Sequence, residues 1–194
     1  ENMVLNLRYQ HRNFYGNRLT AKIYHQNYMT RFGYYQFFPD GGGQSVLNSD
    51  KTGVRIDLDT PIALLPGSKL LWGVDYLQDQ TNQPLVDGRI YVPTMTQQSI
   101  APFAQLKYLL AEKLLIRGGA RYESLSLHAD DYTTLFGGNQ VEGGILQYDQ
   151  LVFNGGAILY VHPLAELFVS YSQGFSVADV GRELRGTGAA SVTA

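Results

Sequence analysis

The sequence contains no cysteine and no apolar stretch long enough to form a membrane-spanning helix. Without cysteine, a disulfide framework, thiolate metal sites and cysteine nucleophiles are excluded. A transmembrane helix needs roughly 18 or more apolar residues in a row, so this class of membrane protein is excluded too. Charged residues make up only 16% of the chain and the formal net charge is −2, so no nucleic-acid partner is expected.

What the sequence does contain is alternation of apolar and polar residues, most cleanly in VRIDLD at 54–59. Successive side chains of a strand point to opposite faces, so each alternating run predicts a strand with one apolar and one mixed face. About eight strands, many of roughly 10 residues, are predicted, and no segment has the 3.6-residue period of a helix. The predicted strands lie near residues 3–9, 19–26, 54–59, 70–76, 104–108, 114–123, 153–162 and 167–174.

The connections between these runs alternate in length. Those after the second, fourth and sixth strands (residues 30–50, 78–98 and 128–147) are long and rich in Gly, Asn, Asp and Tyr, whereas the others are short. In an up-and-down meander, this alternation puts all short turns at one end and all long loops at the other. Compact domains seldom hold several structureless loops of this length. Outer-membrane barrels, in contrast, combine short periplasmic turns with long extracellular loops.

The mixed faces carry ionisable residues that would be costly inside a small soluble core unless each found a partner. Glycine recurs on the apolar parity, at Gly118 and Gly155, where a filled core would need bulk. Tyrosine recurs near strand ends, as in the aromatic girdles of membrane barrels. We therefore predict that the apolar face contacts lipid; a soluble barrel with an apolar centre is the alternative. The residues expected to line the lumen are Arg55, Asp57, Asp75, Arg117, Arg121 and Glu123.

The last residues, GRELRGTGAASVTA, show no alternation and resemble a long loop without its return strand. We therefore expect these residues to be a segment of a bigger barrel, because an open sheet edge in lipid leaves backbone groups unsatisfied. One alternative is a self-contained eight-stranded barrel with a passive pore or a structural or adhesion role. Another is a membrane-embedded hydrolase that uses Ser170 or Ser172.

Two stretches of the chain resemble a known family. Residues 114–127 include Gly-x-Arg-Tyr-Glu at 119–123, and residues 151–185 include Asn-Gly at 154–155 and Leu-Phe-x-Ser-Tyr-Ser-x-Gly-Phe at 167–175. In this order and spacing, they resemble the barrel of TonB-dependent outer-membrane receptors, and most of all the siderophore-receptor branch. The earlier strands resemble this family in pattern only.

The resemblance implies an all-β fold, an antiparallel up-and-down transmembrane β-barrel in the bacterial outer membrane. Residues 1–194 would form part of a 22-stranded barrel domain, with the plug domain and the closing strands absent. The parent protein would bind a ferric siderophore or similar chelate and import it with energy relayed from the TonB complex through the plug. Outer-membrane lipid, the chelate and TonB are therefore the expected partners. No enzymatic activity, resident cofactor or metal site is expected.

The long loops carry residues suited to binding such a chelate. RFGYYQFF at 31–38 places five aromatic residues and one arginine within eight positions. Aromatic rings give large contact areas, and arginine can pair with carboxylate or hydroxamate oxygens. The alternative is that these aromatic residues pack the loops onto one another. The candidate ligand-binding residues are Arg31, Tyr34, Tyr35, Phe37, Phe38, Arg89, Tyr91 and Tyr132.

Overall fold

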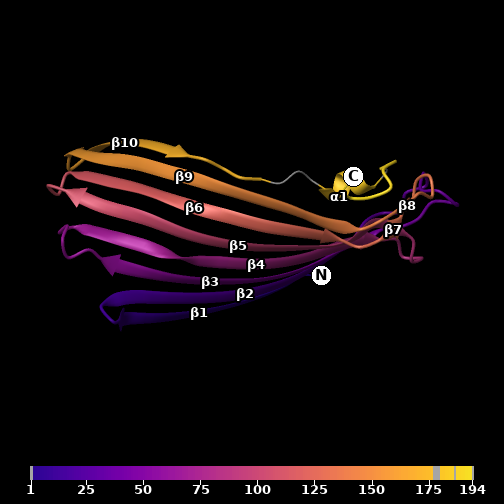
Figure 1. Ribbon diagram of the computed structural model, residues 1–194, viewed down its shortest axis with the longest axis horizontal. Coiled ribbons are helices and arrows are strands. Elements are labelled where there is room, and N and C mark those ends of the chain that lie inside the picture. Colours follow the sequence, from indigo (N-terminus) through magenta and orange to yellow (C-terminus); the bar gives the residue numbers. More distant parts are fainter. Residues whose placement is uncertain (1, 177–179, 186, 194) are drawn as a thin grey trace.

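The computed structural model describes residues 2–176, 180–185 and 187–193. Its main feature is a single antiparallel sheet of eight strands (Figure 1). The strands lie side by side in the order in which they occur along the chain. The strands, in sheet order, are β1 (Asn2–Phe14), β2 (Asn17–Arg31), β3 (Val46–Pro61), β4 (Ser68–Pro84), β5 (Ile90–Leu110), β6 (Leu114–Ala129), β9 (Gly144–His162) and β10 (Ala165–Ser172). The prediction of about eight strands in an up-and-down meander is confirmed.

Several strands are longer than predicted, up to 21 residues in β5. The predicted long loop at 78–98 is mostly strand, since β4 runs to Pro84 and β5 begins at Ile90, which leaves 85–89 as the connection. That part of the prediction is wrong. Its residues are polar on both faces, as in the pair Gln78 with Gln98 on one face and the pair Asp79 with Gln97 on the other, so they pair through the backbone without an apolar signal.

The short turns lie together at one end of the sheet, on the left of Figure 1, and the loops lie at the other end. Two predicted structureless regions at the loop end contain structure. Residues 130–143 hold the two-stranded ribbon of β7 (Tyr132–Thr133) and β8 (Gln140–Val141), and the C-terminal segment holds α1 (Val180–Leu184). Elements this short contain too few residues to reveal a period in the sequence.

The two faces of the sheet differ in chemistry along its whole width. One row of paired residues on the apolar face is Leu19, Leu58, Trp72, Ala104, Ala120 and Phe153. The adjacent row, on the polar face, is Thr20, Asp57, Gly73, Phe103, Arg121 and Val152. Apolar-face residues are uncovered, since Ile56 is 45% exposed and Val169 is 68% exposed. The alternative of a soluble barrel with an apolar centre is therefore wrong.

The apolar residues form a band that crosses the strands obliquely. One row is apolar on β2 to β5 and polar on β6 and β9: Ile23, Val54, Tyr76, Ile100, Ser124 and Asp149. A row nearer the short turns is polar on β4 and mostly apolar from β5 to β10: Ser68, Tyr108, Ile116, Ala157 and Val169. Strands of outer-membrane barrels tilt by roughly 35–45°, so a band of constant height has to cross them in this way.

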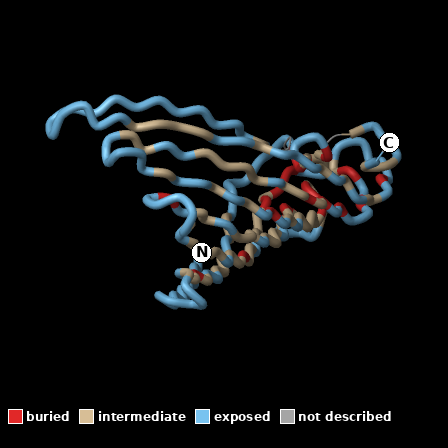
Figure 2. Tube along the Cα trace, turned by 60° about the vertical axis from the view of Figure 1, so that its left-hand side comes forward, coloured by how far each residue is buried: buried red, intermediate tan, exposed pale blue. Residues whose placement is uncertain are grey.

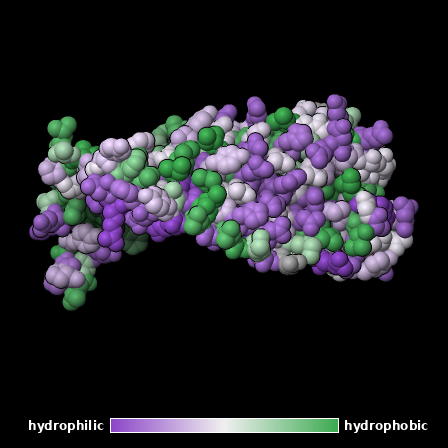
Figure 3. Space-filling model, turned by 90° about the horizontal axis from the view of Figure 1, so that it is seen from below, coloured by the Kyte–Doolittle hydropathy of each residue, from purple (hydrophilic) through white to green (hydrophobic). Residues whose placement is uncertain are grey.

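The buried core sits at the loop end. Ala129, Tyr132, Val141 and Leu184 pack together there. Figure 2 shows most of the buried residues, in red, gathered at this end. Figure 3 shows hydrophilic residues covering much of its surface, on the right. In the part of the chain that the structure describes, no helix has the length and hydropathy needed to cross a bilayer.

The sheet has two open edges. β1 and β10 lie at opposite sides of it, and every residue of both strands is exposed. The described residues therefore do not form the closed eight-stranded barrel considered above. In a bilayer each unsatisfied edge group costs several kcal/mol. A lipid-embedded sheet of this kind therefore needs pairing partners at both edges.

The turn between β5 and β6 provides a test of local strain. Ala111 and Glu112 both have positive φ, 50° and 58°, in a turn closed by the hydrogen bond from the Lys113 amide to the Leu110 carbonyl. Ala111→Gly should raise the free energy of unfolding of the intact protein in detergent by about 0.5–1 kcal/mol, because glycine adopts this conformation without steric cost. Ala120→Gly, in regular strand, should lower it by a similar amount. Equal effects at the two positions would contradict the strained turn.

Candidate functional site

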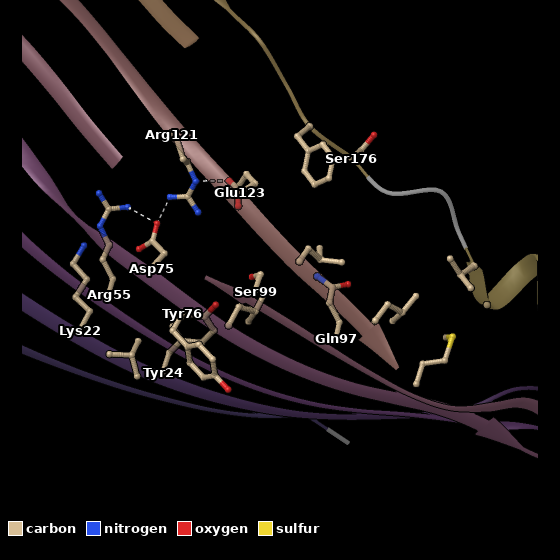
Figure 4. Close-up of a pocket in the computed structure, with 18 residues that line it drawn as sticks. Lys22, Tyr24, Arg55, Asp75, Tyr76, Gln97, Ser99, Arg121, Glu123 and Ser176 are labelled. Atoms are coloured by element: carbon tan, nitrogen blue, oxygen red, sulfur yellow. Dashed lines mark hydrogen bonds and ion pairs between the residues drawn. The ribbon is translucent and has the colours of Figure 1, made fainter. Parts of the chain in front are cut away.

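The polar face of the sheet forms one wall of a cavity of about 680 Å³, which we call the central cavity. The opposite wall comes from the C-terminal segment, through Phe175, Ser176, Val180 and Gly181. Figure 4 shows Ser176 on that segment, across the cavity from the charged side chains of β2, β3, β4 and β6. The cavity is therefore bounded by charge on the sheet side and by small or apolar residues on the other.

Five charged residues of the polar face, Asp75 included, form one network, which we call the Asp75 network. Arg55 and Arg121 both bind the Asp75 carboxylate, with 3.5 Å between Arg55 Nη1 and Asp75 Oδ2 (Figure 4). The Nε atom of Arg121 donates to Glu123, and that of Arg55 donates to Asp57 Oδ1 over 3.1 Å. Two guanidinium groups thus share three carboxylates, which leaves one negative charge in excess.

An aromatic ring supports the network from the neighbouring strand. Phe103 lies 4.4 Å from the guanidinium carbon of Arg55 and 5.9 Å from that of Arg121, measured to the ring centroid. Gly73 stands between Asp57 and Phe103 in their row, and a Cβ there would lie 2.2 Å from the Ile56 carbonyl oxygen. Only glycine fits this close approach. Arg55 and Arg121 each make a cation–π contact with Phe103 in addition to their ion pairs.

Lys22 also lines the central cavity, directly opposite Arg55 in the β2–β3 register. Among the described residues it has no ion-pair partner in the structure. Its ammonium group offsets the excess negative charge of the Asp75 network. The Asp75 network and Lys22 together are thus close to neutral in formal charge.

The structure brings five of the six predicted lumen-lining residues together in the Asp75 network. The sixth, Arg117, lies on the same face nearer the short turns, opposite Lys107 and Gly156. All six therefore share one face of the sheet. Their assignment to a lumen stays a prediction.

Several predicted ligand-binding residues pack the loop end. The Phe38 ring is 7% exposed and lies 5.1 Å from the Tyr35 ring and 5.0 Å from the Tyr91 ring, between centroids. Tyr91 belongs to β5 and not to a loop. The Tyr132 hydroxyl donates to the Leu184 carbonyl over 2.7 Å and is buried, which raises its pKa. Phe38, Tyr91 and Tyr132 thus hold the loops together, as the packing alternative anticipates.

Arg89 binds the neighbouring loop through its whole guanidinium group. Its Nε donates to Asp87 Oδ2 over 2.9 Å, its Nη2 donates to the Gly42 carbonyl over 2.6 Å, and its Nη1 donates to the Pro39 carbonyl. The hydrogen bond from Arg89 holds the pKa of Asp87 below its ordinary value. We call this set of contacts the Arg89 clamp, and its donors are already occupied.

The remaining predicted ligand-binding residues are open to solvent. Tyr34 and Phe37 are each 67% exposed and Tyr35 is 49% exposed. Arg31, the last residue of β2, is exposed and forms no ion pair with any residue that the structure describes. These four residues lie at the start of loop 32–45 or within it.

Two residues that the sequence did not single out contribute to these sites. The sequence offers a reason to single out Phe103, because it is an aromatic residue on the polar parity of its strand. No sequence pattern points to Arg185, because it follows a helix of only five residues. Its guanidinium carbon lies 4.9 Å from the Tyr91 ring centroid and its Nη2 lies 3.4 Å from Gln83 Oε1.

The hydrolase alternative finds no support in the register of β10. Ser170 pairs with Gly156 and Ser172 pairs with Asn154, so neither a histidine nor a carboxylate stands directly opposite. Within the described ranges, no group of three or more His, Asp or Glu side chains is arranged to hold a metal ion.

Comparison with known proteins gives a consistent result. Residues 1–193 match the family model described as TonB dependent receptor-like, beta-barrel. The chain is 23% identical to the ferric aerobactin receptor of Klebsiella pneumoniae, covering 94% of this chain and 29% of that protein. It is 21% identical to the ferric aerobactin receptor of Escherichia coli, covering 92% and 29%, and 24% identical to the rhizobactin receptor of Rhizobium meliloti (strain 1021), covering 45% and 13%. The chain therefore spans less than a third of each of these relatives.

The fold has a counterpart among solved structures. The copper transporter OprC superposes with a TM-score of 0.69 at 14% identity, covering 87% of this chain and 30% of that chain. This similarity concerns the fold alone.

The Asp75 network should contribute measurably to stability. Asp75→Asn removes the carboxylate shared by Arg55 and Arg121, and should lower the free energy of unfolding of the intact protein by about 1–2 kcal/mol, because the groups are only partly exposed. Asp59→Asn is the matched control, since Asp59 pairs with the more exposed Arg18. It should cost less than about 1 kcal/mol. Denaturant unfolding in detergent checks both, and an equal or larger cost for Asp59→Asn would refute the network.

The Arg89 clamp should control the mobility of loop 32–45. Arg89→Gln should speed amide hydrogen exchange at residues 40–43 several-fold, while Arg31→Gln, at the open arginine, should leave it unchanged. The pKa of Asp87 is lowered in the folded state, so its contribution is complete above its unfolded pKa and is lost as pH falls through the folded value. Protection, corrected for intrinsic exchange, should therefore be the same at about pH 5 and about pH 7. Exchange that differs little between Arg89→Gln and the parent protein would argue against the clamp.

Proposed function

The chain belongs to the TonB dependent receptor-like β-barrel family, an outer-membrane family of transporters and not of enzymes, and on this premise we propose that it forms part of a receptor for a ferric siderophore or similar chelate. The observation that carries the proposal is the similarity over most of the chain to two proteins named as ferric aerobactin receptors. Sequence identities of 23% and 21% support a ferric chelate as the class of cargo and do not identify the individual chelate. Energised import would belong to the whole protein, through a plug domain and the TonB complex.

Each face of the sheet has a separate part in this proposal. The uncovered apolar band contacts lipid, and the polar face with the Asp75 network lines the interior of a barrel, expected to have 22 strands. The loop end then lies at the cell surface. Both edge strands pair with further strands of that barrel, which satisfies the backbone groups that would otherwise face lipid.

In this proposal, the solvent-exposed residues of the loop end make the first contact with the chelate. Tyr34, Tyr35 and Phe37 supply exposed aromatic surface, and Arg31 supplies a guanidinium group without a carboxylate partner in the described chain. Arginine forms paired hydrogen bonds with carboxylate or hydroxamate oxygens, and aromatic rings add contact area at small entropic cost. Phe38, Arg89, Tyr91 and Tyr132 would shape the loop and not touch the chelate.

This division of roles can be measured. The double change Tyr34→Ala and Phe37→Ala should weaken binding of ferric aerobactin, the first chelate to test, by about tenfold or more in outer-membrane vesicles carrying the intact protein, because it removes two exposed rings. Tyr15→Asn removes an exposed ring at the opposite end of the sheet and should have no effect. Asparagine tolerates the positive φ of 49° at that position.

Two outcomes would count against different parts of the proposal. If the intact protein binds no ferric siderophore of any class, the proposed cargo is wrong while the family stands. If it binds one and the double variant binds equally well, only the assignment of Tyr34 and Phe37 fails.

A further inference from the structure

Arg185, directly after α1, joins segments from distant parts of the chain. α1 lies at the loop end of the sheet (Figure 1), where Leu184 is buried. The guanidinium carbon of Arg185 lies 4.9 Å from the Tyr91 ring centroid on β5, and its Nη2 donates to Gln83 Oε1 on β4 over 3.4 Å. This side chain therefore ties the C-terminal segment to two strands of the sheet.

One chain of contacts leads from Arg185 to the middle of loop 32–45. The Tyr91 ring lies 5.0 Å from the buried Phe38 ring, and the Phe38 ring lies 5.1 Å from the Tyr35 ring, measured between centroids. Tyr35 is one of the exposed residues proposed above to contact the chelate. Arg185 thus supports it through two intervening rings.

A second chain of contacts leads from Arg185 to the base of the same loop. Gln83, which accepts from Arg185, donates from Nε2 to Ser45 Oγ over 3.0 Å, and both Gln83 and Ser45 are buried. The Ser45 carbonyl in turn accepts from the Phe32 amide over 3.0 Å, which joins the two ends of the loop. Arg185 therefore reaches both the middle and the base of the loop through one residue each.

The stability of the fold alone does not account for an arginine in this place. The Nε atom of Arg185 is buried and has no hydrogen-bond partner, and no carboxylate pairs with Arg185 among the residues that the structure describes. A buried donor without a partner costs free energy. The contacts that Arg185 does make, to a ring and to an amide, both lead to loop 32–45.

We propose that Arg185 is a positioning residue for loop 32–45 and holds its exposed rings in the arrangement that meets the chelate. Arg185 does so without touching the chelate. Because it follows α1 directly, the place of α1 and the arrangement of the loop depend on each other. The role in binding rests on the function proposed above, whereas the coupling between α1 and the loop needs no ligand.

Hydrogen exchange in the intact protein without ligand tests the coupling. Arg185→Gln should speed exchange of the Phe32 and Gly42 amides several-fold, because both amides donate to carbonyls of the same loop. Arg12→Gln, the same change at an exposed position of β1 near the short turns, should leave this exchange unchanged. The unfolding midpoint of Arg185→Gln should match that of the parent protein, which separates lost positioning from general destabilisation.

Binding of ferric aerobactin to the intact protein tests the consequence for the chelate. Arg185→Gln and Tyr91→Leu should each weaken binding about threefold or more, and the double variant should lose much less than the product of the two effects, because both changes break the same contact. Tyr91→Phe keeps the ring and should bind as the parent protein does.

The outcomes separate this inference from the proposed cargo. Unchanged exchange of Phe32 and Gly42 in Arg185→Gln would overturn the positioning role, whether or not any chelate binds. Losses that multiply fully in the double variant would overturn it too, because Arg185 would then act independently of Tyr91. If the parent protein does not bind ferric aerobactin, that cargo is wrong, and the exchange measurement still decides the coupling.

Discussion

An apolar sheet face that nothing covers is the constraint on which the rest of this structure depends. Residues such as Ile56 and Val169 cannot remain exposed to water across eight strands at an acceptable free energy, so the face belongs in hydrocarbon. Once it does, the other face must hold the charged groups of the strands within the apolar band. Most of these charges are neutralised locally, as in the Asp75 network, because charges removed from bulk water need partners.

The sequence predicts the strands wherever the two faces differ in hydropathy, and its predictions fail where this difference ends. Gln78 and Gln98 pair as strand residues although neither face there is apolar, so alternation extends no further as a signal than the apolar band itself. The same limit hides β7, β8 and α1, whose order comes from packing Tyr132, Val141 and Leu184 together at the loop end. Residues far apart in the chain supply that packing, and a local pattern cannot contain it.

The candidate binding residues show a similar division. Composition correctly points to loop 32–45 as rich in aromatic and arginine side chains, but it gives equal weight to Phe37, which is exposed, and Phe38, which is buried. Arg89 looks like an open cation in the sequence, yet it donates to carbonyls 47 and 50 residues away. The parity of the strands is more informative, because the sequence alone places Arg55, Asp75 and Arg121 on one face.

The oblique course of the apolar band means that position along the hydrogen-bonded rows is not depth in the bilayer. Ile23 and Asp149 belong to one row, yet Ile23 lies within the band and Asp149 lies beyond its edge. A charge introduced at Ile23 would enter hydrocarbon, whereas the existing charge at Asp149 reaches the hydrated interface. The tolerance of each strand to polar substitution is therefore displaced from that of its neighbour, by an amount set by the tilt of the wall.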